Sequence, residues 1–176
     1  GKDPSAIIGG KLPFIGSNGR AGKSDIMICE ACEYVDTFLK LSPAISIILN
    51  IDADHLEYFG SLENIIKSFH QFANQTSKVL IVNGDDENVK KAIKDIQDVK
   101  IITFGLGADN DYSAANIKEE PNVFEDFTLM KQGTPLTDIR LSVPGKHNIM
   151  NALAAAATAD YFGISGNDIA KGLHDF

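Results

Sequence analysis

Between residues 25 and 104 the chain alternates short apolar segments with segments of helical periodicity. The apolar segments have the length of strands and cover residues 25–30, 44–51, 78–83 and 100–104. The first two contain nearly continuous apolar runs, which is typical of strands buried on both faces. Such runs constrain the fold strongly, because both of their faces must be covered by other elements.

Two of the intervening segments are predicted to be helices. One begins after Ser61, a good N-cap, and repeats apolar residues at helical spacing as far as Ala73. The other follows the turn Asn83-Gly84-Asp85-Asp86 and carries Val89, Ala92, Ile93 and Ile96. Alternating strands and helices predict parallel pairing through right-handed crossovers. We therefore expect an α/β fold with a mostly parallel, doubly wound sheet and flanking helices.

The pattern changes after residue 110. Residues 111–117, 123–131 and 136–143 resemble three strands, and Gly133-Thr134-Pro135 is a plausible hairpin turn. We expect a small antiparallel sheet here, as a subdomain at about 111–143. Two helices are predicted after it, at 148–162 and 167–173. The length of 176 residues suits a single domain over 1–176.

Composition excludes several functional classes. There are 16 Lys and Arg residues against 24 Asp and Glu, a formal net charge of −8, so we expect no nucleic-acid partner. No apolar run approaches the ~20 residues of a membrane span, so no membrane association is expected. Cys29-x-x-Cys32 alone cannot complete a four-ligand zinc site, and we predict two buried thiols of a cytosolic protein. The sequence does not indicate an oligomeric state.

Gly22-Lys23-Ser24 resembles the end of a phosphate-binding loop. That motif needs a glycine at position 17, where this chain has Ser17, and it precedes a helix. Here a strand is predicted to follow. We therefore reject this segment as a phosphate site.

Acidic residues and a histidine follow the first two predicted strands. Glu30 ends one strand, and Asp54 and His55 closely follow the next. Ligands of open α/β sheets bind at the carboxyl ends of the strands, so these three side chains should gather at one edge. Their oxygen and nitrogen atoms suit Mg²⁺ or Mn²⁺. The alternative is that Asp54 caps a turn and His55 is an ordinary loop histidine.

Two asparagines begin the Ala-rich helix predicted near the C-terminus. Asn148 is a fair N-cap, and Asn151 lies one turn further on the same face. Each amide can donate and accept hydrogen bonds, which suits the edge of a purine. The alternative is an ordinary capped helix.

Several of these motifs together resemble the Mur ligases. They are Glu30-Ala31-Cys32-Glu33-Tyr34, Phe38-Leu39-Lys40-Leu41-Ser42-Pro43, the stretch from Asn50 to Phe59, and Pro144-Gly145-Lys146-His147-Asn148-Ile149-Met150-Asn151. Gly9-Gly10 and Gly16-Ser17-Asn18 also resemble a family segment. Within the family, the member that acts on UDP-N-acetylmuramate and L-alanine is the most similar.

The family has three domains, and the resemblance covers only the central, ATP-binding one. It implies that a Gly-Lys-Thr-Thr phosphate loop lies upstream of Gly1 and an Arg-Arg run beyond Phe176. It also implies a bacterial, cytoplasmic enzyme of peptidoglycan precursor synthesis. We therefore expect this chain alone to be inactive.

The resemblance assigns roles to six residues. Glu30 and His55 would be ligands of two Mg²⁺ ions and the catalytic positions, while His147, Asn148 and Asn151 would contact the adenine of ATP. Asn18 matches a family asparagine near the phosphates. Two departures limit the match: Cys32 stands where many relatives have Asp, and Lys67 does not match the carbamylated lysine of some relatives.

The chemistry implied is ATP-dependent amide formation. The carboxylate of UDP-N-acetylmuramate would attack the γ-phosphate of ATP, and the amine of L-alanine would displace phosphate from the acyl phosphate. Three alternatives stay open: a Mur-type ligase for a different amino acid, a metal-dependent phosphohydrolase using Glu30, Asp54 and His55, and a nucleotide-binding module without chemistry.

Overall fold

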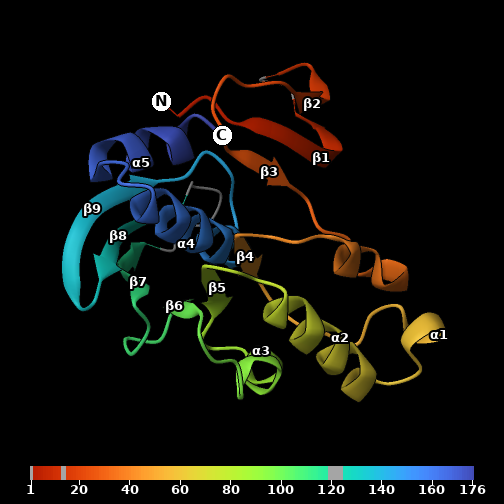
Figure 1. Cartoon of the computed structure of the whole chain (residues 1–176). Coiled ribbons are helices and arrows are strands. Elements are labelled where there is room, and N and C mark those ends of the chain that lie inside the picture. Colours follow the sequence, from red (N-terminus) through yellow and green to blue (C-terminus); the bar gives the residue numbers. More distant parts are fainter. Residues whose placement is uncertain (1, 13–14, 119–124) are drawn as a thin grey trace. The chain divides into compact units, whose positions relative to one another are not determined.

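The computed structural model describes residues 2–12, 15–118 and 125–176 (Figure 1). The chain forms two compact units, Gly1–Lys40 and Leu41–Phe176, and each is described by itself. None of the helices in the described ranges is both long and apolar enough to span a bilayer.

The first unit is built on a three-stranded sheet in the order β2-β1-β3. Strand β1 pairs antiparallel with β2 and parallel with β3, where Ile7 lies opposite Cys29. A 3₁₀ segment, η1, follows the sheet. The bounds are β1 Ser5–Leu12, β2 Ser17–Arg20, β3 Met27–Cys29 and η1 Tyr34–Lys40.

Strand β3 is not the buried strand that the sequence predicted for residues 25–30. Met27 and Ile28 are 58% and 54% exposed, and Cys29 and Cys32 are both exposed free thiols. The prediction of buried thiols is therefore wrong as well. The physical reason is the small size of this unit, in which Phe38 is the only fully buried apolar side chain among the described residues.

The second unit contains a six-stranded mixed sheet in the order β4-β5-β6-β7-β8-β9 (Figure 1). Strands β4 to β7 are parallel to one another, and β7, β8 and β9 are antiparallel. The predicted fold class, a mostly parallel sheet with an antiparallel addition, is confirmed. The bounds are β4 Ile45–Ile48, β5 Val79–Asn83, β6 Lys100–Phe104, β7 Tyr112–Lys118, β8 Asp126–Lys131 and β9 Thr134–Arg140.

The antiparallel strands continue the parallel sheet. Strands β6 and β7 are in register at Phe104 and Tyr112. Beside that pair, Thr103 N donates to Asp111 Oδ2 and Asp111 N donates to Thr103 Oγ1, both at 2.9 Å. Side chains therefore hold much of this junction together. The start of the predicted strand 123–131 lies outside the described residues.

The helices in the described part of the second unit are α1 Leu56–Phe59, α2 Leu62–Asn74, α3 Glu87–Ile93, α4 Lys146–Tyr161 and α5 Gly166–His174. Ser61 caps α2 by accepting a hydrogen bond from Asn64 N, as predicted. Asp86 caps α3, because its Oδ1 accepts from the backbone N–H groups of Asn88 and Val89. These caps satisfy N–H groups that a helix start otherwise leaves unpaired.

The core lies on both faces of the sheet, as a doubly wound fold requires. Alternate residues of β5 point to opposite faces: Val79 and Ile81 pack in the cluster that contains α4 and α5, and Leu80 and Val82 in the cluster with α2 and α3. Strand β4 differs from the prediction, because Ile48 is buried but Ile47 is 43% exposed. The reason is that β4 is an edge strand of this sheet.

Candidate functional site

The carboxyl ends of β4 and β5 are joined by asparagine side chains. Asn83, the last residue of β5, donates from Nδ2 to the carbonyl oxygen of Leu49 at 2.9 Å. Asn88, in the first turn of α3, donates in the same way to the carbonyl oxygen of Ile51, also at 2.9 Å. The segment leaving β4, which leads to His55, is thus fixed to the end of β5 and the start of α3.

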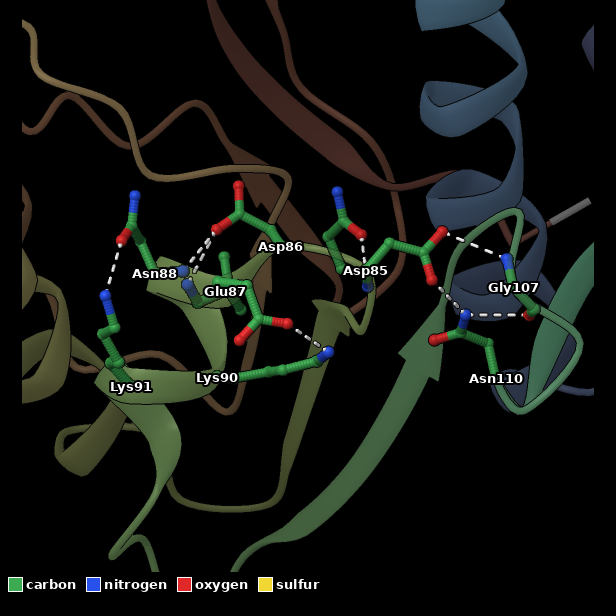
Figure 2. Close-up of polar contacts among 10 residues, drawn as sticks. Asp85, Asp86, Glu87, Asn88, Lys90, Lys91, Gly107 and Asn110 are labelled. Carbon is green, nitrogen blue, oxygen red and sulfur yellow. Dashed lines mark hydrogen bonds and ion pairs between the residues drawn. The ribbon is translucent and has the colours of Figure 1, made fainter.

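The loops after β5 and β6 are joined by Asp85 (Figure 2). Its Oδ2 accepts hydrogen bonds from the backbone N–H groups of Leu106 and Gly107, at 2.6 and 3.1 Å. Its Oδ1 accepts from Nδ2 of Asn110 at 2.8 Å, and the same amide also donates to Gly107 O. Both oxygens of the Asp85 carboxylate therefore bind the loop that follows β6.

The ionised form of Asp85 is favoured by these contacts. Partial burial alone would raise the pKa of Asp85, but the hydrogen bonds from Asn110, Gly107 and Leu106 outweigh it and the pKa is lowered. Gly105 is needed for the close packing, because a Cβ there would lie 2.5 Å from Asp85 Oδ2 and from Asn110 Nδ2.

His55 lies between β4 and α1 with a left-handed backbone, φ 53°. Its Nδ1 is 3.5 Å from Glu57 Oε1 and 3.9 Å from Asp54 Oδ1. Both carboxylates are largely exposed, and Asp54 also accepts a hydrogen bond from the backbone N–H of His55. Imidazole nitrogens and carboxylate oxygens are atoms that can bind a divalent cation such as Mg²⁺ or Mn²⁺.

Glu30 directly follows β3 in the first unit. Its Oε2 accepts a hydrogen bond from the backbone N–H of Gly9 at 2.6 Å. A Cβ at position 9 would lie 2.9 Å from Oε1 of Glu30, so the glycine permits this approach. The carboxylate is exposed and retains lone pairs for a cation. Asn18 is an exposed residue of β2 in the same unit.

Glu30 therefore lies in a different unit from Asp54 and His55. The prediction that these three side chains gather at one edge remains a prediction. What the structure does bring together is His55 with Asp54 and Glu57, and Glu30 with Gly9.

The residues predicted to contact adenine lie in the first two turns of α4. The N-cap is Gly145, so the prediction that Asn148 is the N-cap is wrong. Gly145 has φ 110°, and a Cβ there would lie 2.7 Å from Cε1 of the His147 ring. This turn therefore requires glycine, because its backbone is left-handed and the imidazole lies against it.

The two asparagines have different hydrogen-bonding duties. Asn148 donates from Nδ2 to Pro144 O at 2.8 Å, which fixes the turn before the helix. Asn151 donates to Asn148 Oδ1 at 3.4 Å, so the two side chains do share one face, as predicted. Among the described residues, Oδ1 of Asn151 accepts no hydrogen bond, and its NH₂ group has a second hydrogen to donate.

Both asparagines line a cavity of about 500 Å³ between α4 and α5. Its walls are largely apolar, and α5 contributes Ile169, Gly172 and Leu173. Pockets of 300–1,000 Å³ with apolar walls and a few polar groups are typical of small-molecule sites. The free amide edge of Asn151 supplies such a polar group.

Two features of the site were missed by the sequence analysis. Asp85 was read only as part of a turn, although its partner Asn110 lies 25 residues away. Glu125 was assigned no role, yet its Oε1 accepts from Gly145 N at 3.2 Å, and its buried Oε2 has no partner among the described residues. Helical or strand periodicity carries no signal for such long-range contacts.

The sequence profile of the Mur ligase middle domain matches residues 11–159. The chain belongs to the Mur ligase family. The family segment includes Asn18, Glu30, His55 and the start of α4, so the resemblance seen in the sequence is confirmed.

Curated Mur ligases from two bacteria match nearly the whole chain. The UDP-N-acetylmuramate–L-alanine ligase of Acetivibrio thermocellus is 42% identical over 177 residues, and that of Agathobacter rectalis is 40% identical over 176 residues. Each alignment covers 99% of this chain and 38% of the relative. The chain therefore spans a little over a third of the length of these Mur ligases.

Solved structures of Mur ligases share the fold. A UDP-N-acetylmuramate-alanine ligase from Thermotoga maritima has a TM-score of 0.83 at 26% identity, covering 99% of this chain and 39% of that one. A UDP-N-acetylmuramate:L-alanyl-gamma-D-glutamyl-meso-diaminopimelate ligase from Neisseria meningitides has a TM-score of 0.86 at 24% identity, covering 100% and 58%.

Proposed function

We propose that this chain is the ATP-binding middle part of a bacterial, cytoplasmic ligase that joins L-alanine to UDP-N-acetylmuramate. The observation that carries the proposal is the pair of amides at the start of α4, within a chain 42% identical to such a ligase. The choice of L-alanine rests on that identity alone.

Asn151 supports the adenine assignment most directly. Its Oδ1 and its second N–H are available on one edge, so the side chain can accept from the N6 amino group of adenine and donate to N7. Asn148 holds the turn in place through Pro144, and His147 lies against Gly145. Asn148 and His147 would then shape the adenine site.

Glu30 and His55 are the proposed holders of Mg²⁺. Glu30 offers an exposed carboxylate beside Gly9, and His55 offers an imidazole flanked by Asp54 and Glu57. When bound, such ions neutralise charge on the phosphate oxygens of ATP. Asn18 is proposed to lie near those phosphates.

The reaction that we propose for the whole protein forms one amide bond per ATP. The carboxylate of UDP-N-acetylmuramate attacks the γ-phosphate, ADP leaves, and the amine of L-alanine then displaces phosphate from the acyl phosphate. Positioning and charge stabilisation supply most of the catalysis in phosphoryl transfer. Glu30 and His55 would therefore act as positioning groups for the metal ions, and neither would be a nucleophile.

An assay of phosphate release with the longer protein tests this proposal. With ATP and Mg²⁺ present, release should require both UDP-N-acetylmuramate and L-alanine, and the product should contain an amide between them. Release that needs neither substrate would favour a phosphohydrolase. Release with a different amino acid but not with L-alanine would favour another Mur-type ligase.

A further inference from the structure

The cavity between α4 and α5 is longer than an adenine base bound at its polar end, at Asn151. Asn148, Ala152, Ala155 and Ala159 line it from α4, and their spacing places them along one face of that helix. At 1.5 Å per residue, the stripe from Asn148 to Ala159 extends about 16 Å. A fused two-ring base is shorter than two helical turns, about 11 Å. A base held at Asn151 therefore leaves the Ala159 end unfilled.

The unfilled end has apolar walls. Ala155 and Ala159 face it from α4, and Ile164, Leu173 and Phe176 face it from the segments around α5. Asp168, the one carboxylate that the described residues place in the wall, already accepts a hydrogen bond from Ser165 Oγ at 2.7 Å. A neutral apolar group is therefore the kind of ligand that fits this end.

Gly172 keeps the wall of α5 open. It lies inside α5, its φ is outside the left-handed region, and a Cβ placed on it would meet no heavy atom within 4 Å. Glycine is a poorer helix former than alanine or leucine. Neither backbone strain nor steric conflict therefore requires a glycine at position 172. The effect of the missing side chain is to leave space in the cavity.

We propose that the end of this cavity between Ala155 and Phe176 is a second subsite, which binds an apolar aromatic group attached to an adenine-like head. The inference rests on the proposed adenine contact of Asn151. The ligand class is an adenine with a neutral one-ring substituent. N6-benzyladenine belongs to this class, and it keeps one N6–H and N7 to pair with the Asn151 amide.

The test compares adenine with N6-benzyladenine as ligands of this chain, using NMR titration of isotope-labelled protein to obtain each Kd. Ala155, Gly172 and Phe176 are exposed to solvent, so a phenyl group would be partly buried between them. Burial of about half of its surface should make N6-benzyladenine bind about 3- to 12-fold more tightly than adenine. Gly172→Leu should remove this gain by filling the subsite, while the Kd of adenine stays the same. Leucine also favours the helix, so unfolding would not explain the loss.

Asn167→Leu is the matched control, because Asn167 is an exposed residue of α5 that does not line the cavity. It should retain the full gain. Equal affinities of the two ligands, or a gain that survives in Gly172→Leu, would overturn the subsite and leave the adenine contact standing. Failure of both ligands to bind would overturn the adenine contact and the subsite together.

Discussion

Asp85 and Asn110 are hydrogen-bonded at 2.8 Å between Oδ1 and Nδ2, although 25 residues separate them in the sequence. The bond joins the loop that leaves β5 to the loop that leaves β6. Because β4 is parallel to β5 and β6, His55 follows the same edge of the sheet as these two loops. The shape of this edge therefore depends on a contact that binds no ligand itself.

Asp85→Ala should lower the free energy of unfolding by about 1–3 kcal/mol, because it leaves the N–H groups of Leu106 and Gly107 and the buried Asn110 amide without their acceptor. Urea denaturation measures this change. Asp95→Ala, which removes an exposed carboxylate from the surface, should stay within about 0.5 kcal/mol of the wild type. Equal effects of the two substitutions would contradict the role of Asp85.

Stability should fall in acid. Asp160 accepts hydrogen bonds from Tyr112 Oη at 2.5 Å and Lys131 Nζ at 2.6 Å. Burial would raise the pKa of Asp160, but these two partners outweigh it, and the pKa is lowered, as it is for Asp85. A carboxyl group with a lowered pKa stabilises the fold above its unfolded pKa of about 4, and the contribution is lost as the pH falls through the folded value.

The measurement is urea denaturation at several pH values in acid, for the wild type and for Asp160→Asn. The variant should be less stable than the wild type near neutral pH, and its stability should depend less on pH below about 4. Parallel pH profiles for the two proteins would rule out this contribution from Asp160.

Asn151→Ala should raise the KM for ATP in the whole ligase and leave kcat nearly unchanged. The contact with adenine would be equally strong in the ground state and the transition state, so its loss weakens binding alone. Asn151 is proposed to make two hydrogen bonds to adenine, and each one lost corresponds to a rise of about two- to twelve-fold, so the KM should rise by at least that factor. Asn167→Ala is a suitable control. A fall in kcat without a change in KM would refute the adenine assignment.

Glu30→Gln in the whole ligase should mainly reduce kcat, because the amide keeps the shape of the side chain but removes the charge that would hold Mg²⁺. His55→Ala should also reduce activity, and a large excess of Mg²⁺ should partly restore it. Steady-state kinetics against Mg²⁺ concentration provide the measurement, with Glu63→Gln, at an exposed residue of α2, as the control. A kcat near the wild-type value in Glu30→Gln would argue against the metal role.

This chain alone should not turn over ATP at a useful rate. Gly22-Lys23-Ser24 precedes β3 and not a helix, and Lys23 N donates to Asp3 Oδ2 at 3.0 Å. This segment therefore cannot provide the backbone cradle of a phosphate loop. Steady phosphate release by the purified chain, abolished in Glu30→Ala, would show that the expectation is wrong.

Sequence periodicity correctly predicted strands and helices that pack against other elements in the interior of the fold. Strand β5 is an example, because residues 78–83 were predicted to be a strand and the structure has one there, with core on both faces. Burial on both faces was predicted for residues 25–30 and 44–51, and it failed for β3 with Cys29 and for Ile47 of β4, since an apolar run reveals neither how few apolar residues surround it nor whether the strand lies at an edge. At the site, helical spacing placed Asn148 and Asn151 together, whereas Asp85–Asn110 and Glu125–Gly145 join distant residues and left no local pattern.

The junction between β6 and β7 has a mechanical consequence. The parallel and antiparallel halves of the sheet meet at few contacts. These are the Phe104–Tyr112 pair and the hydrogen bonds between Thr103 and Asp111. Helix α4 stabilises this junction, because it packs on β5 and β6 of the parallel half and on β7, where the antiparallel half begins. A mechanical force that displaces α4 would therefore weaken the packing of both halves of the sheet at once.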